Sequence, residues 1–251
     1  MMACGVIRPR TAMVLAAGRG SRMRPLTDDI PKALLPLGGR TLLDHALDRL
    51  ADAGVELVVV NAHWQAERLA AHLAVRAAAR RGPETVVRHE PVLLETGGGV
   101  RAARDILGRD PFYVINGDAF WLDGPRPALD RVAQAFSAGD ADDVLLVHRT
   151  SQVRAETGRG DFAVDPRGAV RRRGEREVVP YTYAGVHLLT PALLDAAPGG
   201  SFSMNLIWDR AIAAGRLRAV VHDGLWFHLS TPADLAEAEA LLHERWPDER
   251  R

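Results

Sequence analysis

Apolar runs of strand length alternate with amphipathic stretches over the first 150 residues. Residues 11–17 form a continuous apolar run that ends at Gly18, which is typical of a strand buried on both faces of a sheet. Thr41 and Asp44 form a capping box that starts a helix, and Gly54 ends it. The same pattern predicts strands over 55–60, 84–89, 111–116 and 143–148, and helices over 65–80 and from Gly97 onward. This alternation predicts an α/β fold, with an open, mostly parallel sheet and helices on both faces.

The pattern changes in the last third of the chain. Residues 160–189 carry turn signals of Gly, Pro and Asp between short apolar runs, which predicts antiparallel strands. A final helix is predicted to have Thr231 as its cap and Pro232 as its first residue. Between them we expect helices near 190–197 and 203–214 and a strand near 217–222. The chain shows no internal repeat and no linker, so we expect a single domain over 11–251 with halves 11–150 and 151–251.

The N-terminus has some features of a short signal peptide, because Arg8 and Arg10 precede the apolar run 11–17. Arg19 and Arg22 follow the run directly, and the run has the minimum length of a signal-peptide core. We therefore interpret it as the first strand and residues 1–10 as a flexible leader. This interpretation predicts a cytoplasmic protein.

Composition excludes several classes of protein. The chain has 32 basic and 32 acidic residues, and this balance argues against broad nucleic-acid binding and against a polybasic membrane surface. A single cysteine, Cys4, excludes a disulfide framework and a Cys-rich zinc site. No apolar run approaches the roughly 20 residues of a membrane-spanning helix. We expect an ordinary globular protein with neither nucleic acid nor membrane as a partner.

One lysine stands among the 32 basic residues, at Lys32, and all the others are arginine. Chance survival of one lysine would explain this. The alternative is that Lys32 places a compact point charge on a phosphate, which a planar guanidinium cannot do equally well.

The segment 15–24 combines two glycines with several arginines directly after the first predicted strand. Gly18 and Gly20 allow a sharp turn whose amides converge on an anion. The segment lacks the Gly-Lys-Ser/Thr of a Walker loop, and Met23 occupies the third glycine position of a dinucleotide fingerprint, which argues against a dinucleotide-dependent oxidoreductase. A Gly-x-Gly turn alone is weak evidence, but Arg22 and Lys32 nearby supply the cations that a polyphosphate requires.

Three motifs together resemble a known family. Leu-Ala-Ala-Gly-Arg-Gly-Ser-Arg-Met-Arg-Pro-Leu-Thr with Pro-Lys-Ala-Leu-Leu-Pro, Glu-Thr-Gly-Gly-Gly at 95–99 and Asn-Gly-Asp at 116–118 are similar to the signatures of sugar-1-phosphate nucleotidyltransferases. The resemblance covers the chain after residue 10. It is strongest to the short bacterial branch of N-acetylmuramate-1-phosphate uridylyltransferases, and mannose-1-phosphate guanylyltransferases are also similar. It implies a Rossmann-like fold of the GT-A type with a small antiparallel sugar-binding portion.

The resemblance also implies roles for individual residues. Arg22 would hold the leaving pyrophosphate, Lys32 would bridge the two reacting phosphates, and Asp118 would bind Mg²⁺, with Mn²⁺ as an alternative. The nucleotide would be held by Leu15, Ala16, Ala17, Gly18, Gly20, Glu90, Thr96, Gly97 and Gly98. The sugar would lie against the second half, 151–251, and contact Asn116, Tyr183, Gly185 and Asn205. For Glu90, the role of a plain surface carboxylate is an equal alternative to nucleotide binding. For Tyr183, the alternative to a sugar contact is a packing role in the core.

The chain departs from the family pattern at two places. His228 stands where relatives carry an aspartate that binds a second metal ion. His228 would ligate a metal, or would hydrogen-bond the phosphates and leave one Mg²⁺ on Asp118, or would only pack. The lysine that some relatives carry within 165–180 is absent, and Arg172 or Arg173 are its candidate replacements.

The predicted function is transfer of a nucleotidyl group from a nucleoside triphosphate to a sugar 1-phosphate, with release of pyrophosphate. The preferred substrates are UTP and N-acetylmuramate 1-phosphate, as in peptidoglycan recycling, and the alternative is GTP with mannose 1-phosphate. A weakly active nucleotide-sugar sensor or regulatory subunit is the hypothesis of another class, motivated by His228. We expect a monomer or a small homo-oligomer.

Overall fold

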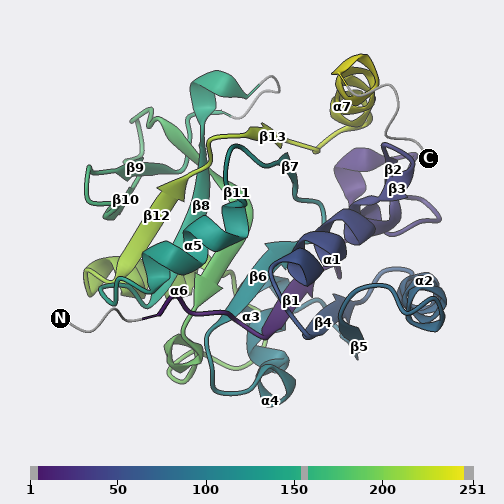
Figure 1. The fold of residues 1–251 in the computed structure, drawn as a ribbon, viewed down its shortest axis with the longest axis horizontal. Coiled ribbons are helices and arrows are strands. Elements are labelled where there is room, and N and C mark those ends of the chain that lie inside the picture. Colours follow the sequence, from purple (N-terminus) through teal and green to yellow (C-terminus); the bar gives the residue numbers. More distant parts are fainter. Residues whose placement is uncertain (1–4, 154–157, 246–251) are drawn as a thin grey trace.

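The computed structural model describes residues 5–153 and 158–245 (Figure 1). Residues 1–4 of the predicted leader, including Cys4, lie outside the described residues. Residues 5–10 form neither helix nor strand, and the Ile7 amide donates to Ser137 Oγ at 2.8 Å. The flexibility of the leader stays a prediction. Within the described ranges, no helix combines the length and the apolar character needed to cross a bilayer.

A mixed sheet forms the centre of the molecule (Figure 1). Its strands lie in the order β10-β9-β11-β6-β1-β4-β5, with β8 beside β11 and β12 beside β8. Strands β5, β4, β1 and β6 are mutually parallel, whereas β11 is antiparallel to both β6 and β8. The bounds are β1 Thr11–Leu15, β4 Leu57–Ala62, β5 Glu84–His89, β6 Phe112–Asn116, β8 Asp143–Arg149, β9 Phe162–Val164, β10 Val170–Arg172, β11 Tyr181–Leu189 and β12 Leu217–Val221. The α/β prediction, including an antiparallel portion after residue 160, is confirmed.

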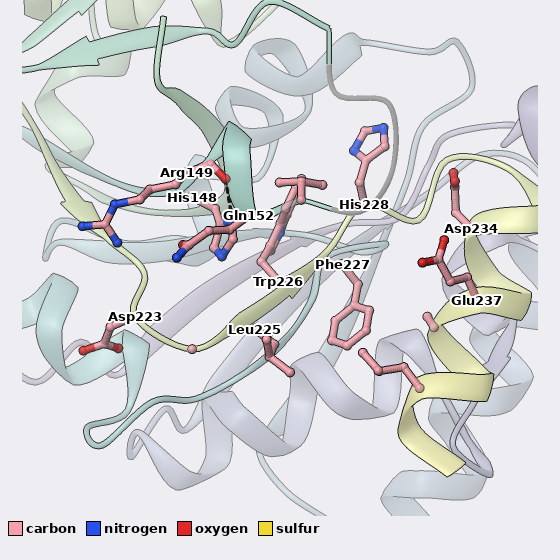
Figure 2. Close-up of a pocket in the computed structure, with 14 residues that line it drawn as sticks. His148, Arg149, Gln152, Asp223, Leu225, Trp226, Phe227, His228, Asp234 and Glu237 are labelled. Carbon is pink, nitrogen blue, oxygen red and sulfur yellow. Dashed lines mark hydrogen bonds between the residues drawn. The ribbon is translucent and has the colours of Figure 1, made fainter. Parts of the chain in front are cut away.

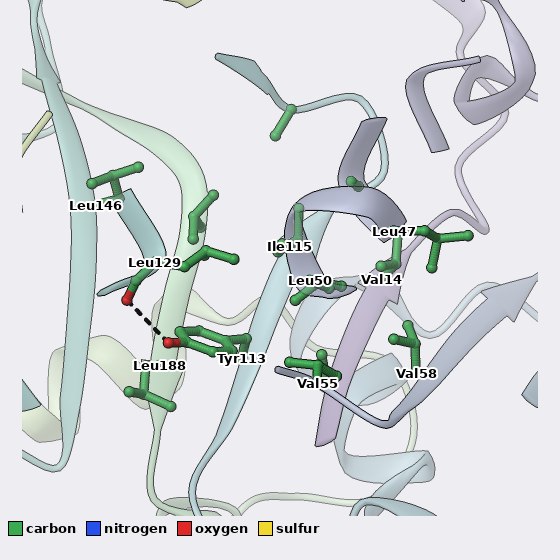
Figure 3. Close-up of a cluster of buried hydrophobic side chains, with 14 of the residues drawn as sticks. Val14, Leu47, Leu50, Val55, Val58, Tyr113, Ile115, Leu129, Leu146 and Leu188 are labelled. Carbon is green, nitrogen blue, oxygen red and sulfur yellow. Dashed lines mark hydrogen bonds between the residues drawn. The ribbon is translucent and has the colours of Figure 1, made fainter. Parts of the chain in front are cut away.

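Helices cover both faces of this sheet. Apolar residues of α1, α2 and α5 pack on one face, and those of α3, α4 and α6 pack on the other. Figure 3 shows part of the first core, where the Tyr113 hydroxyl donates to the Leu129 carbonyl at 3.0 Å. The bounds are α1 Leu42–Asp52, α2 Ala66–Ala78, α3 Glu95–Ala102, α4 Arg104–Leu107, α5 Ala128–Phe136, α6 Asn205–Ala213 and α7 Pro232–Arg245. Short 3₁₀ helices are η1 Ser21–Met23, η2 Lys32–Leu34, η3 Thr150–Gln152 and η4 Pro191–Leu194.

Several predicted elements are confirmed and others differ. Strand β5 matches the predicted range 84–89, and Thr41 Oγ1 accepts from the Asp44 amide at 3.0 Å, which confirms the helix cap. The helix predicted near 190–197 is only the 3₁₀ helix η4, and Pro198 disfavours a helical extension through the residue before it. The helix predicted to open at Gly97 begins at Glu95, so its glycines lie inside the helix. Helix α5 was not predicted.

A short pair of strands outside the main sheet joins the middle of the chain to its C-terminal part. Strand β7 (Phe120–Leu122) pairs with β13 (Leu225–Phe227) in antiparallel register, with Trp121 opposite Trp226. A second short pair joins β2 (Pro36–Leu37) and β3 (Arg40–Thr41). Leu229, just beyond β13, joins a small apolar cluster with Met23, Leu35 and Phe120. This cluster holds the residues after β13 beside those that follow β1.

Helix α3 packs too closely on its neighbours to accept a side chain at Gly98. A Cβ there would lie 2.4 Å from the Gly200 carbonyl oxygen. Alanine is ordinarily about 1 kcal/mol better than glycine inside a helix, but overpacking costs about 1–3 kcal/mol. We expect Gly98→Ala to lower the free energy of unfolding by about 1 kcal/mol in urea denaturation. Gly199→Ala is the control, since its nearest neighbour is Arg101 Nη1 at 4.0 Å, and equal midpoints for both variants would contradict the prediction.

Candidate active site

A cavity of about 360 Å³ opens at the carboxyl ends of the parallel strands. Ligands of open parallel sheets bind at this edge, because the loops that follow the strands converge there. The cavity brings together residues from the loops after β1, β5 and β6. The predicted site residues that line it are Leu15, Ala16, Ala17, Gly18, Gly20, Arg22, Lys32, Glu90, Thr96, Asn116 and Asp118.

The segment after β1, residues 16–20, is called the 16–20 loop below. Gly20 has φ of 61°, and a Cβ on it would lie 3.1 Å from Lys32 Cβ, so this position requires glycine. Thr27 Oγ1 donates to the Gly20 carbonyl at 2.8 Å and holds the end of the loop. The amides of Ala17, Gly18 and Gly20 donate to no protein acceptor within the described residues. Three free amides beside one cavity can bind an anion.

Two cations of opposite exposure flank the 16–20 loop. Arg22 lies on η1, whose neighbouring Met23 is fully buried and fixes the turn, while the Arg22 side chain is exposed. Lys32 is the first residue of η2, and only 14% of its side chain is exposed. The chain therefore presents an exposed fork-shaped cation and a largely buried point cation to the same cavity.

Lys32 and Asp118 form an ion pair in the structure. Lys32 Nζ lies 2.5 Å from Asp118 Oδ2, and 39% of the Asp118 side chain remains exposed. Asp118 follows β6 in a tight turn in which the Ala119 amide donates to the Asn116 carbonyl at 2.9 Å. Asn116 at the end of β6 and Asp118 thus both line the cavity.

Fewer residues of the Glu-Thr-Gly-Gly-Gly motif line the cavity than predicted. Thr96 lines the cavity, but its Oγ1 also accepts from the Met204 amide at 2.8 Å, at the start of α6. Gly97 and Gly98 are buried, and both amides donate to the Phe202 carbonyl. They do not line the cavity, and their glycine identity follows from close packing of α3. Their nucleotide role stays a prediction.

The residues predicted to contact the sugar lie outside this cavity, except Asn116. Gly185 is buried in a bulge of β11, with φ of 81°, and a Cβ there would lie 2.8 Å from Ala119 Cβ. The Tyr183 ring packs against Trp208 at 4.8 Å between centroids, and burial raises the pKa of its hydroxyl far above the ordinary value. Asn205 begins α6 and its Oδ1 accepts from Arg172 at 3.1 Å. Their sugar contacts stay predictions.

Both candidate replacements for the missing family lysine are held by protein partners. Arg172 forms an ion pair with Asp209 and stacks over Phe162, at 5.3 Å from its ring centroid. Arg173 Nε donates to the Gly160 carbonyl at 3.0 Å. Neither arginine lines the cavity beside the 16–20 loop.

His228 lines a second cavity of about 550 Å³ between β13 and α7 (Figure 2). Trp226 stands between His148 and His228 there, at 5.9 and 5.7 Å between ring centroids, and its Nε1 donates to the Ala184 carbonyl. Burial is the main cause that lowers the pKa of His228, and the positive charges of Arg22 and Lys32 lower it further. The lowered pKa favours the neutral form of the imidazole.

Asn61, Glu95 and Ser230 are among the residues that line the first cavity but were not predicted as site residues. Asn61 is a polar residue near the carboxyl end of an apolar strand, and this position in the pattern is a signal for a site residue. Ser230 has an Oγ that is buried without a hydrogen-bond partner in the described part of the chain. Glu95 carried no separate signal, because it was grouped with the glycine motif.

The geometry combines free backbone amides, two cations and one partly exposed carboxylate around a single cavity. Amides and cations suit a polyphosphate, and a carboxylate beside phosphates suits a divalent metal ion with oxygen ligands. Asp118 with phosphate oxygens and water would satisfy such an ion, and no group of three acidic, His or Cys side chains capable of holding a metal is found within 5–153 and 158–245.

Comparisons with known proteins place this geometry in a family. Residues 12–153 match the family model described as the MobA-like NTP transferase domain. The chain is 42% identical to the N-acetylmuramate α-1-phosphate uridylyltransferase of Caulobacter vibrioides, over 94% of this chain and 98% of the relative. It is 33% identical to the enzyme of that name from Neisseria meningitidis serogroup B, over 92% of this chain and 97% of the relative.

More distant matches agree on the fold. The mannose-1-phosphate guanylyltransferase of Mycobacterium tuberculosis is 29% identical over 92% of this chain and 64% of its own length. A crystal structure of UDP-glucose pyrophosphorylase with UDP-glucose superposes with a TM-score of 0.78 at 16% identity, over 94% of this chain and 99% of that one. The chain therefore belongs to the MobA-like NTP transferases and, among them, to the sugar-1-phosphate nucleotidyltransferases.

Proposed function

We propose that the protein transfers the uridylyl group of UTP to N-acetylmuramate 1-phosphate and releases pyrophosphate. The observation that carries the proposal is the 42% identity, over nearly the full length of both chains, to an enzyme named for this reaction. The cluster of Lys32, Asp118 and the free amides of the 16–20 loop supports it, because the reaction joins two polyanions. A role in peptidoglycan recycling and a cytoplasmic location belong to the same proposal.

The reaction requires no general base. The sugar phosphate is largely a dianion at neutral pH, since its second pKa is near 6. One of its oxygens attacks the α-phosphorus of the triphosphate, the new P–O bond forms, and the bond to the pyrophosphate oxygen breaks. The protein has to align the reactants, which alone contributes up to about 7–11 kcal/mol, and to neutralise the charge on the five-coordinate phosphorus.

Each side chain of the cavity has a proposed part in this step. The amides of Ala17, Gly18 and Gly20 and the guanidinium of Arg22 would hold the β- and γ-phosphates. Lys32 would leave Asp118 and bridge the α-phosphate and the sugar phosphate. Thr96 and the backbone of residues 15–17 would border the nucleoside. We assign the sugar to residues 151–251 and to Asn116.

Asp118 is the proposed ligand of Mg²⁺, and the partly exposed carboxylate beside the phosphate-binding loop fits that ion. The ion would supply Lewis-acid polarisation of the phosphate oxygens. Mn²⁺ is the alternative ion. His228 lines the neighbouring cavity, and its three proposed roles are ligation of a second metal ion, a hydrogen bond to the phosphates, or packing alone. We propose a monomer or small homo-oligomer.

A substrate matrix tests the function. We expect purified protein to release pyrophosphate fastest from UTP with N-acetylmuramate 1-phosphate, because a cavity matched to one base and one sugar aligns only that pair well. The assay takes the four common nucleoside triphosphates against N-acetylmuramate, N-acetylglucosamine, glucose and mannose 1-phosphates, each with Mg²⁺, Mn²⁺ and Zn²⁺. Turnover of GTP with mannose 1-phosphate alone would replace the proposed substrates. Nucleotide-sugar binding by calorimetry without turnover under any of these metals would instead establish a sensor.

A further inference from the structure

Two buried polar side chains, Asn61 and Glu90, form a hydrogen-bonded pair beneath the 16–20 loop. Asn61 lies near the end of β4 and Glu90 directly follows β5. They are 2% and 1% exposed, and Asn61 Nδ2 donates to Glu90 Oε1 at 2.7 Å. Because buried polar groups lose free energy when they are unpaired, this pair has one favoured arrangement.

The outer atoms of the pair hold two segments of the site. Asn61 Oδ1 accepts from the Ala16 amide at 2.7 Å, and Glu90 Oε2 accepts from the Leu94 amide at 3.1 Å. Ala16 begins the 16–20 loop, and Leu94 directly precedes α3. One continuous chain of hydrogen bonds therefore connects the loop after β1 to the start of α3, through the ends of β4 and β5.

Helix α3 packs directly against this chain of hydrogen bonds on one side. A Cβ on Gly99 would lie 2.8 Å from both Asn61 Nδ2 and Glu90 Oε1. A water molecule or a rotated side chain therefore has no space on that side. The order of donors and acceptors along the chain is fixed by packing as well as by hydrogen bonding.

We propose that Asn61 and Glu90 are positioning residues for the nucleoside triphosphate. Their hydrogen-bond chain engages the Ala16 amide and so orients the next residues of the 16–20 loop, whose amides at Ala17, Gly18 and Gly20 remain free to face the phosphates. Both carboxylate oxygens of Glu90 are engaged within the protein. This inference rests on the proposed nucleotidyl transfer and adds a role for two residues that act through the backbone.

Exchanging the amide and the carboxylate between positions 61 and 90 tests the proposal, because donors and acceptors alternate along the chain of hydrogen bonds. Asn61→Asp places an acceptor against an acceptor at residue 90, and Glu90→Gln leaves an N–H group facing an N–H group in every orientation of the two amides. The double variant Asn61→Asp, Glu90→Gln restores all three hydrogen bonds. The new carboxylate at 61 accepts from Ala16 and from the new amide at 90, whose oxygen accepts from Leu94. Volume and total charge match the wild type.

We expect each single variant to lower kcat/KM for UTP about 10- to 100-fold, because the misplaced amides of the 16–20 loop no longer match the phosphates. KM for the sugar phosphate is expected to change less than about twofold. The double variant is expected to recover kcat/KM for UTP to within about threefold of wild type, because the effects of substitutions within one hydrogen-bond network are not additive. UTP affinity, measured by calorimetry without sugar phosphate, is expected to follow the same order.

Glu84→Gln is the matched control, the same substitution at an exposed position on β5. Single variants with wild-type kcat/KM for UTP would overturn the proposal. So would a double variant that melts like the wild type but keeps the kinetic defect. If a single variant does not fold, the kcat/KM of the double variant and its UTP affinity by calorimetry still test the proposal. A wild-type protein without turnover would refute the proposed function instead, and UTP affinity would then test the pair alone.

Discussion

Lys32→Ala lowers kcat for nucleotidyl transfer by about 10²- to 10³-fold, the usual effect of removing one fixed charge that stabilises a transition state. Lys32 is the more buried of the two cations at the cavity, because its side chain is 14% exposed while the Arg22 side chain is exposed to solvent. A buried ammonium acts in a medium of lower effective dielectric constant and is already in place when charge develops on the phosphorus. Steady-state pyrophosphate release measures the loss.

Two comparisons make this result specific. Lys32→Arg is expected to recover only part of the loss, since a planar fork cannot occupy the position of a point charge beside two phosphates. Arg24→Ala removes a cation from the same segment, but Arg24 pairs with Asp28 outside the cavity, so its kcat should stay near that of the wild type. Near-normal turnover of Lys32→Ala with its cognate substrates would remove Lys32 from the mechanism.

Asp118→Asn is expected to lower kcat by about 10²- to 10³-fold and to raise the Mg²⁺ concentration required for half-maximal activity. The amide keeps the size of the side chain but has no charge to bind a divalent cation and no charge to pair with Lys32. Mn²⁺ binding to the ligand-free protein, measured by electron paramagnetic resonance, reports the same site independently of turnover. We expect that signal to weaken in the variant.

Asp110→Asn is the control for this variant. Asp110 is exposed and precedes β6, whereas Asp118 follows it, so the two side chains lie at opposite ends of this strand. It should leave both the Mg²⁺ requirement and Mn²⁺ binding unchanged. Unchanged Mg²⁺ dependence in Asp118→Asn would assign the metal to another ligand.

The sequence predicted those parts of the fold whose cause is local. Strand β5 and the Thr41 cap were found because an apolar run and a side-chain cap act within a few residues. Strands β7 and β13 were missed, since each has three residues and each exists through a partner about 100 residues away. The brevity of η4 was also missed, although Pro198 disfavours helical backbone in the residue before it.

The candidate site divides in the same way. The loops after β1 and β6 were found because contiguous motifs place Gly18, Lys32 and Asp118 at the ends of neighbouring strands. Motif position does not determine which way a residue faces, and Tyr183 and Asn205 line neither cavity. Asn61 was missed although a polar residue at the end of an apolar strand is a signal, because its hydrogen bonds to Ala16 and Glu90 join residues far apart in the chain.

The pairing of β7 with β13 has a consequence for the order in which the site is assembled. A ribosome makes residues 15–118, with the loop amides, Lys32 and Asp118, more than 100 residues before it makes Leu225–Ser230. Ser230 lies shortly after β13, and the pairing of β13 with β7 places it at the cavity. A nascent chain of 200 residues therefore contains the loop amides, the cations and the carboxylate but lacks the side of the cavity that Ser230 lines.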